Sequence, residues 1–323
     1  MSDKRGITPI KIGVVGCGKM GQNHIRILSE MSGIFDLIGF YDPDKTKEKV
    51  ARSYGINQYV SYDEMLVTCD AVTIACPTSM HKEMALKAAK EGKHALVEKP
   101  IAEDLHDTQE IISAFKKNEL MLTVGHVERY NPVVTTLCEI LKSMDIVAIE
   151  IHRCSPFDSR IYDVDVVSDL MIHDIDILVN GIMEEYPLNI FAFSKSVHNS
   201  RFADYAHAVF SFSNGVNAFV TTSRATEDKI RMIVVHALGA YIEADMLNKS
   251  LTIKKGVNYE LQHASYRQYS VTENVFVPLV EPLREELKNF GEAILGKKAM
   301  VIGGDQIIRA MQVLDTVKGI IYT

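Results

Sequence analysis

A glycine pattern between an apolar strand and a helix is the feature that most constrains the fold of this chain. Residues 10–16 (IKIGVVG) form a continuous apolar run, as expected for a strand covered on both faces. Three glycines follow in the spacing GxGxxG as a helical pattern begins. They allow a tight turn and the close approach of a diphosphate to the helix N-terminus. The residues predicted to contact a dinucleotide here are Gly16, Gly18, Lys19, Met20 and Gly21.

A carboxylate stands where a dinucleotide-binding fold places the acid that holds the ribose hydroxyls. The second apolar run, LIGFYD, ends at Asp42, 21 residues after Gly21. A carboxylate at this position repels a 2′-phosphate, so NAD is favoured over NADP. The alternative for Asp42 is a turn residue before Pro43, because the sequence DPD suits a turn.

Strand-like and helix-like segments alternate through the first third of the chain. Strands are predicted near Tyr59 and at 70–77, 93–98 and 120–126, with helices at 45–54, 79–92 and 104–117. This alternation indicates βαβ units and a parallel sheet, whose ligands bind at the carboxyl ends of the strands. The residues that follow two of these strands, and are predicted to face the cofactor, are Pro77, Thr78, His81, Glu98 and Lys99.

The pattern changes after about residue 124. Strands joined by short turns are predicted at 145–154, 188–197, 205–215, 216–225, 231–238 and 240–246. The sequence SNG at 213–215 indicates a hairpin. We therefore expect an α/β Rossmann domain over 1–123 and an α+β domain with a mostly antiparallel, open-faced sheet over 124–323. The second domain is assigned to substrate binding and oligomerisation.

A helix expected at roughly 163–182 carries the sequence SDLMIHDIDIL. Asp169 and His173 are four residues apart and share one face, and Asp176 lies near that face. These residues form either a catalytic set or the polar side of an otherwise apolar helix. A metal site is not expected, because one Asp–His pair lacks further ligands at a suitable spacing.

Charge and cysteine content exclude several classes of function. The formal net charge is −7 and no basic block occurs, so nucleic acid and acidic membranes are not expected as partners. The five cysteines are scattered and form no CxxC pair, which indicates free thiols in a reducing cytosol. No apolar run has the length of a membrane span, and the early one is too short for a signal peptide. We expect a cytoplasmic protein.

Taken together, these motifs resemble the Gfo/Idh/MocA family of NAD(P)-dependent sugar oxidoreductases. The likeness covers essentially the whole chain and rests on GVVGCGKMGQNH, CPTSMH, EKP, DLMIHDID and EPLREELKNF. It implies that Lys99, Asp169 and His173 frame the nicotinamide and the sugar carbon being oxidised. It also implies that the Lys99–Pro100 peptide bond can be cis. Where the family often has glycines before the Asp-x-x-x-His segment, this chain has Val167 and Ser168.

A narrower resemblance concerns the substrate. The segments VGHVERYNP, RCSPF and RIYDVDVVSDLMIHDIDIL look like the UDP-N-acetylglucosamine 3-dehydrogenase branch, which oxidises the sugar 3-hydroxyl to a ketone. The related UDP-N-acetylglucosaminuronate 3-dehydrogenases are close neighbours of that branch. The alternatives are a free sugar or inositol dehydrogenase and, in another class, a non-catalytic regulator that senses a dinucleotide. The family is commonly dimeric or tetrameric, so we expect a homodimer or homotetramer.

Oxidation of a secondary alcohol needs a base and a group that stabilises negative charge on the oxygen. His173 is the first choice of base, with Lys99 donating to the same oxygen; Lys99 is the alternative base. Asp169 would orient His173 or bind a sugar hydroxyl. Arginine forks suit the UDP diphosphate. The residues predicted to bind substrate are Arg129, Tyr130, Asn131, Arg153, Arg160, Asp169 and His173, with Arg224 a further candidate arginine.

Overall fold

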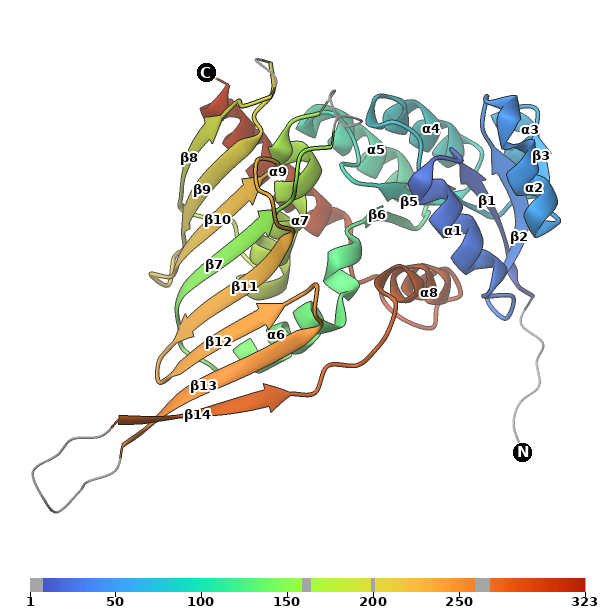
Figure 1. Ribbon diagram of the computed structural model, residues 1–323. Helices are drawn as coiled ribbons and strands as arrows, with labels where there is room; N and C mark the ends of the chain where they lie inside the picture. The colour runs from blue at the N-terminus through green and yellow to red at the C-terminus, as the bar shows by residue number, and fades with distance from the viewer. Residues whose placement is uncertain (1–7, 159–163, 199–200, 259–267, 323) are drawn as a thin grey trace, which may run out of the picture. The chain divides into compact units, whose positions relative to one another are not determined.

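The computed structural model describes residues 8–158, 164–198, 201–258 and 268–322. Its chain forms two compact units (Figure 1), one from the described part of 1–127 with 283–311 and one from the described part of 128–282 with 312–322. A single division near residue 123 therefore does not describe the chain. Helix α8 (Pro282–Ile294) belongs almost entirely to the first unit, because Leu287 and Phe290 pack in that unit's core.

The sheet of the first unit confirms the predicted parallel arrangement. Its described strands are β1 (Ile10–Val15), β2 (Phe35–Tyr41), β3 (Asn57–Tyr59), β4 (Ala71–Ile74), β5 (His94–Glu98) and β6 (Leu122–Gly125). They pair in the order β3-β2-β1-β4-β5-β6, and every pair is parallel. The order reverses between β1 and β4, and such a switch point is where open α/β sheets bind ligands.

Helices cover both faces of this sheet. They are α1 (Lys19–Ser29), α2 (Glu48–Tyr54) after the 3₁₀ turn η1 (Lys45–Lys47), α3 (Tyr62–Thr68), α4 (Thr78–Lys90) and α5 (Leu105–Lys117). Ile12 and Val14 pack with α1 and α8 on one face, whereas Gly13 lies against Met65 of α3 on the other. Helix α3 was not among the predicted elements, although Ser61 caps it by accepting the Glu64 N–H. Helix α9 (Gly304–Ile321) ends the described chain.

The second unit contains the predicted, mostly antiparallel sheet. Its described strands are β7 (Ile146–Cys154), β8 (Asn189–Lys195), β9 (Tyr205–Ser211), β10 (Asn217–Ser223), β11 (Ile230–Ala237), β12 (Ala240–Asp245), β13 (Ser250–Asn258) and β14 (Gln268–Val275). They pair in the order β14-β13-β12-β11-β7-β10-β9-β8, with β7 and β10 the parallel pair. The hairpin predicted at 213–215 joins β9 to β10, where Gly215 has φ +86°.

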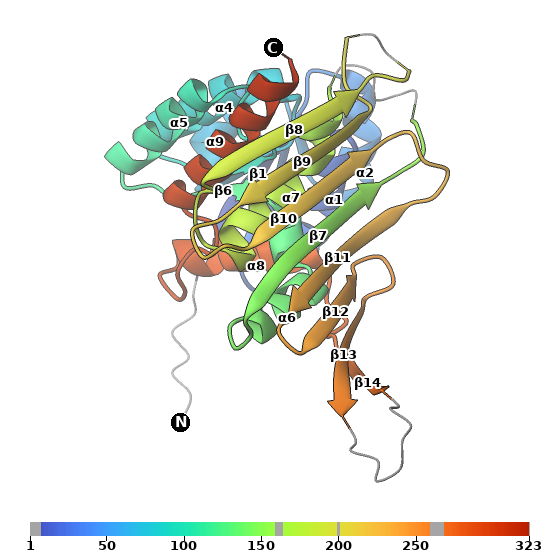
Figure 2. The same cartoon turned by 90° about the vertical axis from the view of Figure 1, so that its left-hand side faces the viewer.

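One face of this sheet is covered by helices. Figures 1 and 2 show α6 (Pro132–Leu141) and α7 (Ile172–Asp176) on the same side of the strands. Side chains alternate accordingly: Val220 of β10 is fully buried, whereas its neighbour Phe219 is partly exposed on the opposite face. This arrangement is the open-faced sheet expected from the alternating strand pattern.

The helix predicted at 163–182 is irregular. A π-helical turn, η3 (Val167–Met171), leads into α7, and a second one, η4 (Ile177–Ile182), follows it. Wide turns of this kind are rare and are frequent at functional sites. Within the described parts of the chain, no helix combines the length and apolar character needed to cross a membrane.

Candidate active site

The glycine loop lies between β1 and α1, as the sequence predicts. Gly16 has φ +87°, and a Cβ there would lie 2.7 Å from the carbonyl oxygen of Ala75. A Cβ at Gly21 would lie 1.9 Å from the carbonyl oxygen of Gly16, so α1 touches the loop backbone directly. A Cβ at Gly18 would meet nothing within 4 Å. The first and third glycines are thus required by packing, and the second leaves open space beside the N-terminus of α1.

Asp42 links the end of β2 to the glycine loop. Its Oδ2 atom accepts the N–H of Cys17 at 2.7 Å, and its Oδ1 atom accepts the N–H of Asp44 at 2.8 Å. Asp42 therefore stabilises the turn, as the alternative prediction expected, and it also places a carboxylate beside the dinucleotide loop. These two interpretations of the residue are compatible, because each carboxylate oxygen keeps a further lone pair for a ribose hydroxyl.

Lys99 lies where the sequence placed it, directly after β5. Val97 pairs with Ile74 of β4, and Ile74 pairs with Val15 of β1, so the three strand ends lie along one edge. The Lys99–Pro100 peptide bond is cis, in agreement with the hypothesis drawn from the family. Lys99 is half-buried, so its side chain is at the boundary between the strand end and solvent.

Glu98 and His81 were predicted as cofactor contacts, but both side chains are engaged inside the first unit. Oε1 of Glu98 lies 2.9 Å from Nε2 of His24. Burial raises the pKa of Glu98, but the hydrogen bond and charge of His24 and the charge of Lys99 outweigh it, so the net pKa is lowered. The carboxylate is therefore a buried anion with a buried partner.

His81 bridges two loops. Its Nδ1 atom lies 2.9 Å from the carbonyl oxygen of Pro100, and its Nε2 atom lies 2.9 Å from that of Cys76. A neutral ring can donate to only one of these oxygens, and a protonated ring to both. Burial lowers the pKa of His81, and the two carbonyl contacts only partly oppose this. The remaining predicted contacts lie around these loops: Pro77 precedes α4, Thr78 begins it, and Lys19 and Met20 begin α1.

In the second unit, Asp169 and His173 lie on one accessible stripe of the helical segment. Between Asp165 and Asn180, only Asp169, Leu170 and His173 are partly exposed, and all other residues are buried. The carboxylate of Asp165 accepts the N–H groups of Val167 and Ser168 at 2.9 Å and so caps the segment. The helix thus presents the two predicted catalytic side chains while its other faces are packed.

Asp169 is held by Arg224, which follows β10. Nη2 of Arg224 lies 3.0 Å from Oδ2 of Asp169, and Nη1 donates to the carbonyl oxygen of Val164 at 2.8 Å. Arg224 is buried, so this guanidinium fixes the start of the helical segment. Its contacts are those of a structural clamp and not of a free diphosphate fork.

Asp176 does not share the exposed face of Asp169 and His173. It is buried, and its Oδ1 atom accepts the amide of Asn180 at 2.9 Å and lies 3.5 Å from Nη1 of Arg129. The π-helical turns shift the side-chain directions that a regular helix would give. Arg129, a predicted diphosphate ligand, is therefore paired with a buried carboxylate.

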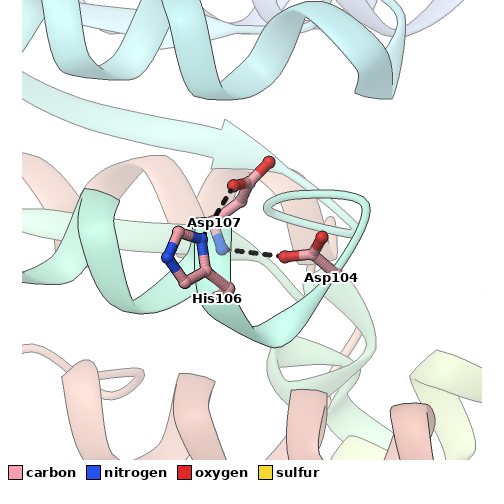
Figure 3. A group of neighbouring side chains, drawn as sticks. All are labelled: Asp104, His106 and Asp107. Atoms are coloured by element: carbon pink, nitrogen blue, oxygen red, sulfur yellow. Dashed lines mark hydrogen bonds and ion pairs between the residues drawn. The ribbon is translucent and has the colours of Figure 1, made fainter.

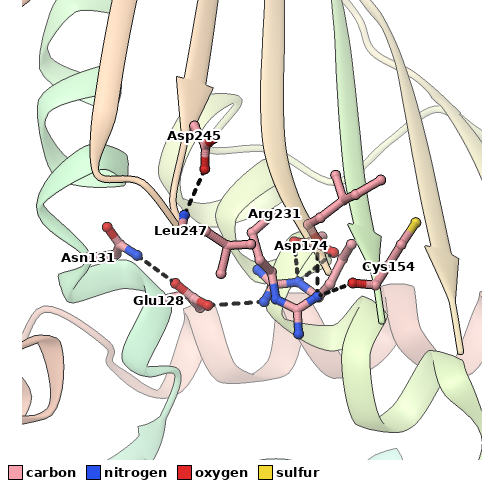
Figure 4. A network of polar contacts seen from close by, with 9 residues as sticks. Glu128, Asn131, Cys154, Asp174, Arg231, Asp245 and Leu247 are labelled. Atoms are coloured by element: carbon pink, nitrogen blue, oxygen red, sulfur yellow. Dashed lines mark hydrogen bonds and ion pairs between the residues drawn. The ribbon is translucent and has the colours of Figure 1, made fainter. Parts of the chain in front are cut away.

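Arg153 is the centre of a buried polar network that includes Asp174 and Glu128. Its Nε atom lies 2.8 and 2.9 Å from the two carboxylate oxygens of Asp174, and its Nη1 atom lies 3.0 Å from Oε1 of Glu128. Arg231, labelled in Figure 4, donates to the carbonyl oxygen of Cys154 at 3.2 Å. Because Arg153 is only 2% exposed, its predicted role as a diphosphate ligand does not fit its position.

The other predicted substrate residues have varied positions. Asn131 caps α6 by accepting the N–H of Val133 at 3.1 Å and donates to Glu128 at 2.9 Å, as Figure 4 shows. Tyr130 is buried. Arg160 lies outside the described residues.

A further polar group, Asp104, His106 and Asp107, lies at the start of α5 (Figure 3). Asp104 caps this helix by accepting the N–H of Asp107 at 2.8 Å. Lys82 forms an ion pair with Asp107 at 2.6 Å, and Nδ1 of His106 lies 3.4 Å from the same carboxylate oxygen. Helix capping and an ion pair account for these contacts, and we assign no ligand to the group.

His24, Glu128 and Arg231 were not singled out by the sequence. The one available signal was at His24, a polar residue on the face of α1 that also carries the buried Gly21, Ile25 and Leu28. A polar residue on such a face needs a buried partner. The sequence does not identify that partner, because Glu98 is 74 residues away.

Comparison with known proteins decides the family. The family model described as "Oxidoreductase family, NAD-binding Rossmann fold" matches residues 10–126. UDP-N-acetylglucosamine 3-dehydrogenase of Acidithiobacillus ferrooxidans is 30% identical over 250 residues, which cover 76% of each chain. The chain belongs to the Gfo/Idh/MocA family of oxidoreductases. Inositol 2-dehydrogenase of Ralstonia nicotianae is 28% identical over 179 residues, 52% of this chain and 53% of that protein.

Solved structures of similar proteins share the fold of this chain. The Acidithiobacillus ferrooxidans enzyme superposes with a TM-score of 0.87 at 26% identity, covering 98% of both chains. The WlbA dehydrogenase from Bordetella pertussis, solved with NADH and UDP-GlcNAcA, superposes with a TM-score of 0.79 over 97% of this chain and 96% of that one. At 16% identity, this second likeness concerns the fold alone.

Proposed function

We propose that this protein oxidises a secondary hydroxyl of a sugar to a ketone with NAD, and that the substrate is a UDP-sugar oxidised at its 3-hydroxyl. UDP-N-acetylglucosamine is the first choice. The observation that carries the proposal is one edge of the first sheet, where the glycine loop, Asp42 and Lys99 follow the carboxyl ends of β1, β2 and β5. The substrate assignment is supported by the 30% identity to UDP-N-acetylglucosamine 3-dehydrogenase.

The first unit fits a dinucleotide. The open space at Gly18 allows a diphosphate to approach the N–H groups at the start of α1. The carboxylate of Asp42, fixed by two backbone N–H groups, suits ribose hydroxyls and disfavours a 2′-phosphate. When bound, the nicotinamide ring supplies the acceptor for the hydride.

The chain's own residues supply the proton chemistry. His173 would take the proton of the hydroxyl, because histidine exchanges protons readily near neutral pH. Lys99 would donate a hydrogen bond to the same oxygen and stabilise its negative charge, or would act as the base itself. Asp169, oriented by Arg224, would hold His173 or a neighbouring sugar hydroxyl.

The diphosphate of the substrate is not assigned to the described arginines that the sequence favoured. Arg129, Arg153 and Arg224 each hold a carboxylate within the second unit. Breaking a buried ion pair to bind a ligand would leave a buried charge without a partner, which is costly.

The test is the appearance of NADH absorbance when the protein is mixed with NAD and UDP-N-acetylglucosamine. A ketone trap or a partner aminotransferase draws the reaction forward. We expect turnover in the wild type and in Lys90→Ala, whose lysine is exposed at the end of α4. We expect none in Lys99→Ala, although NAD still binds. Full activity in Lys99→Ala would contradict the proposal.

The likeness to inositol 2-dehydrogenase supports a second candidate, a dehydrogenase for a free polyol. The same assay with inositol and unphosphorylated sugars tests it. Turnover of these compounds, with no binding of UDP, would favour the second candidate. NAD binding with no turnover of any sugar would favour a regulator that senses the dinucleotide.

A further inference from the structure

The two residues that flank Lys99 are each tied to a buried histidine from a different helix. Before Lys99, the carboxylate of Glu98 lies 2.9 Å from Nε2 of His24 in α1. After it, the carbonyl oxygen of Pro100 lies 2.9 Å from Nδ1 of His81 in α4. We refer to His24, Glu98, Pro100 and His81 as the brace.

The first arm of the brace is buried. His24 is 0% exposed, and its Nε2–H donates to the carboxylate of Glu98. The second oxygen of Glu98 accepts the N–H of Lys99 at 3.3 Å. Gly125 of β6 leaves room for this carboxylate, because a Cβ there would lie 2.9 Å from Oε2 of Glu98. Glu98 is thus held from α1 and β6 and itself contacts the backbone of Lys99.

The second arm joins two strand ends. His81 is 1% exposed, and its ring contacts the carbonyl oxygens of Cys76 and Pro100, each at 2.9 Å. Cys76 follows β4 and Pro100 follows β5, which are hydrogen-bonded neighbours in the sheet. A neutral ring donates to one of these oxygens, and donation to that of Pro100 would hold the chain on the far side of Lys99.

Stabilisation of the sheet does not by itself require these contacts. Strands β4 and β5 are already joined by their own backbone ladder, and apolar side chains at positions 24 and 81 would avoid the cost of burying polar rings. Both imidazoles instead contact groups one residue from Lys99. A displacement of about 1 Å in a catalytic group can cost about a hundredfold in rate.

We propose that His24 and His81 are positioning residues for Lys99, which hold the backbone of residues 98–100 so that the lysine side chain starts from a fixed point. This inference rests on the proposed function for the catalytic role of Lys99. The holding of the 98–100 backbone can be tested without it.

The variants separate hydrogen bonding from volume. His24→Leu and His81→Leu remove the donors, whereas His24→Gln and His81→Gln each keep an amide donor. His94→Gln is the matched control, because His94 lies at the opposite end of β5 and accepts the N–H of Met121 at 2.9 Å. Should a leucine variant fail to fold, a methionine variant at the same position carries the comparison, because methionine also lacks an N–H donor.

Two measurements are made on each variant: amide hydrogen exchange at residues 96–102 without ligands, and kcat and KM with NAD and the UDP-sugar. In the leucine variants we expect exchange at residues 98, 99 and 101 to accelerate at least tenfold. We also expect kcat to fall about a hundredfold with KM changed less than threefold. The glutamine variants should recover at least tenfold of the lost kcat, and His94→Gln should match the wild type.

Wild-type exchange in both leucine variants, or in the methionine variants where those alone fold, would overturn the brace. Faster exchange with unchanged kcat, in an enzyme that Lys99→Ala inactivates, would overturn its positioning role. If the wild type turns over no sugar, the proposed function fails, and the exchange data still decide whether the two histidines hold this backbone.

Discussion

Arg153 and Asp174 form an ion pair with almost no access to solvent, in which the guanidinium Nε lies 2.8 and 2.9 Å from the two carboxylate oxygens. Arg153 also contacts Glu128, so one guanidinium is shared by two carboxylates. Burial and charge shift the pKa values of the two partners for different reasons. Burial lowers the pKa of Arg153, but the two carboxylates outweigh burial and the net pKa is raised. Burial raises the pKa of Asp174 to about 6, and Arg153 only partly opposes it. Only the pKa shift of Asp174 affects protonation near neutral pH, because an arginine stays charged at any physiological pH.

Loss of the guanidinium should be severe. Arg153→Met keeps much of the volume but leaves Asp174 and Glu128 without their shared cation, and removal of one partner from a buried pair costs about 3–5 kcal/mol. We expect urea denaturation to show a loss of that size in the free energy of unfolding. The matched control is Lys142→Met, whose lysine pairs with Glu139 at the surface; this substitution should change stability far less, because an exposed ion pair contributes little. Equal effects of the two substitutions would contradict a structural role for Arg153.

Asp174 should make stability depend on pH in a specific direction. Its pKa of about 6 in the fold exceeds the ordinary value of 3.8, so the folded state binds this proton more tightly than the unfolded state. The contribution to stability is therefore complete below pH 4 and is lost as pH rises to about 6, by on the order of 3 kcal/mol.

Asp174→Asn removes this titration. The difference in unfolding free energy between wild type and Asp174→Asn, measured by urea denaturation from pH 4 to 7, should shift against the wild type as pH rises. Because other groups titrate equally in both proteins, their effects cancel in the difference. A difference that stays constant, or that shifts in favour of the wild type, would show that the ion pair outweighs burial.

The sequence was most informative where signals are local. Apolar runs, glycine spacing and Asp42 predicted the first sheet, its loop and the edge that carries Lys99, because strand and turn preferences depend on near neighbours. Helix α8 packs with β1 and β2 although more than 240 residues separate them along the chain, and no local pattern indicates such a return.

The sequence places candidate side chains along the sheet edge but does not reveal their partners. His81 and Glu98 were predicted to contact the cofactor, yet each is engaged by a group from elsewhere in the first unit. The arginines show the same limit. Arg153 looks like a diphosphate fork in sequence, but its partner Asp174 is 21 residues away on another element. Whether a charged side chain faces solvent or a buried partner depends on tertiary contacts that a motif does not encode.

Gly21 and Gly18 of the loop should differ sharply in whether they tolerate a methyl side chain. Gly21→Ala would place a methyl group 1.9 Å from the carbonyl oxygen of Gly16, which forces α1 away from the loop. We expect a loss of about 3 kcal/mol in unfolding free energy. Gly18→Ala meets no atom within 4 Å and should leave stability within about 0.5 kcal/mol.

Dinucleotide affinity is the second property that Gly18→Ala should change, because the space at Gly18 is where a diphosphate would approach. Fluorescence titration with NADH should show at least a tenfold loss of affinity in Gly18→Ala, about 1.4 kcal/mol, in a fully stable protein. Unchanged affinity in Gly18→Ala would mean that the diphosphate does not use this space.

The choice between NAD and NADP should depend on the charge of Asp42. Asp42→Asn keeps one oxygen that can accept the N–H of Cys17, but it loses the acceptor for the N–H of Asp44 and the charge that repels a 2′-phosphate. The affinity for NADP relative to NAD should therefore rise at least tenfold, with the fold intact. Asp36→Asn is the matched control, since Asp36 is exposed near the opposite end of β2 and should leave the ratio unchanged. Isothermal titration with both dinucleotides measures the ratio. An equal ratio in all three proteins would reduce Asp42 to a turn residue, and the preference for NAD would then have to come from another part of the loop.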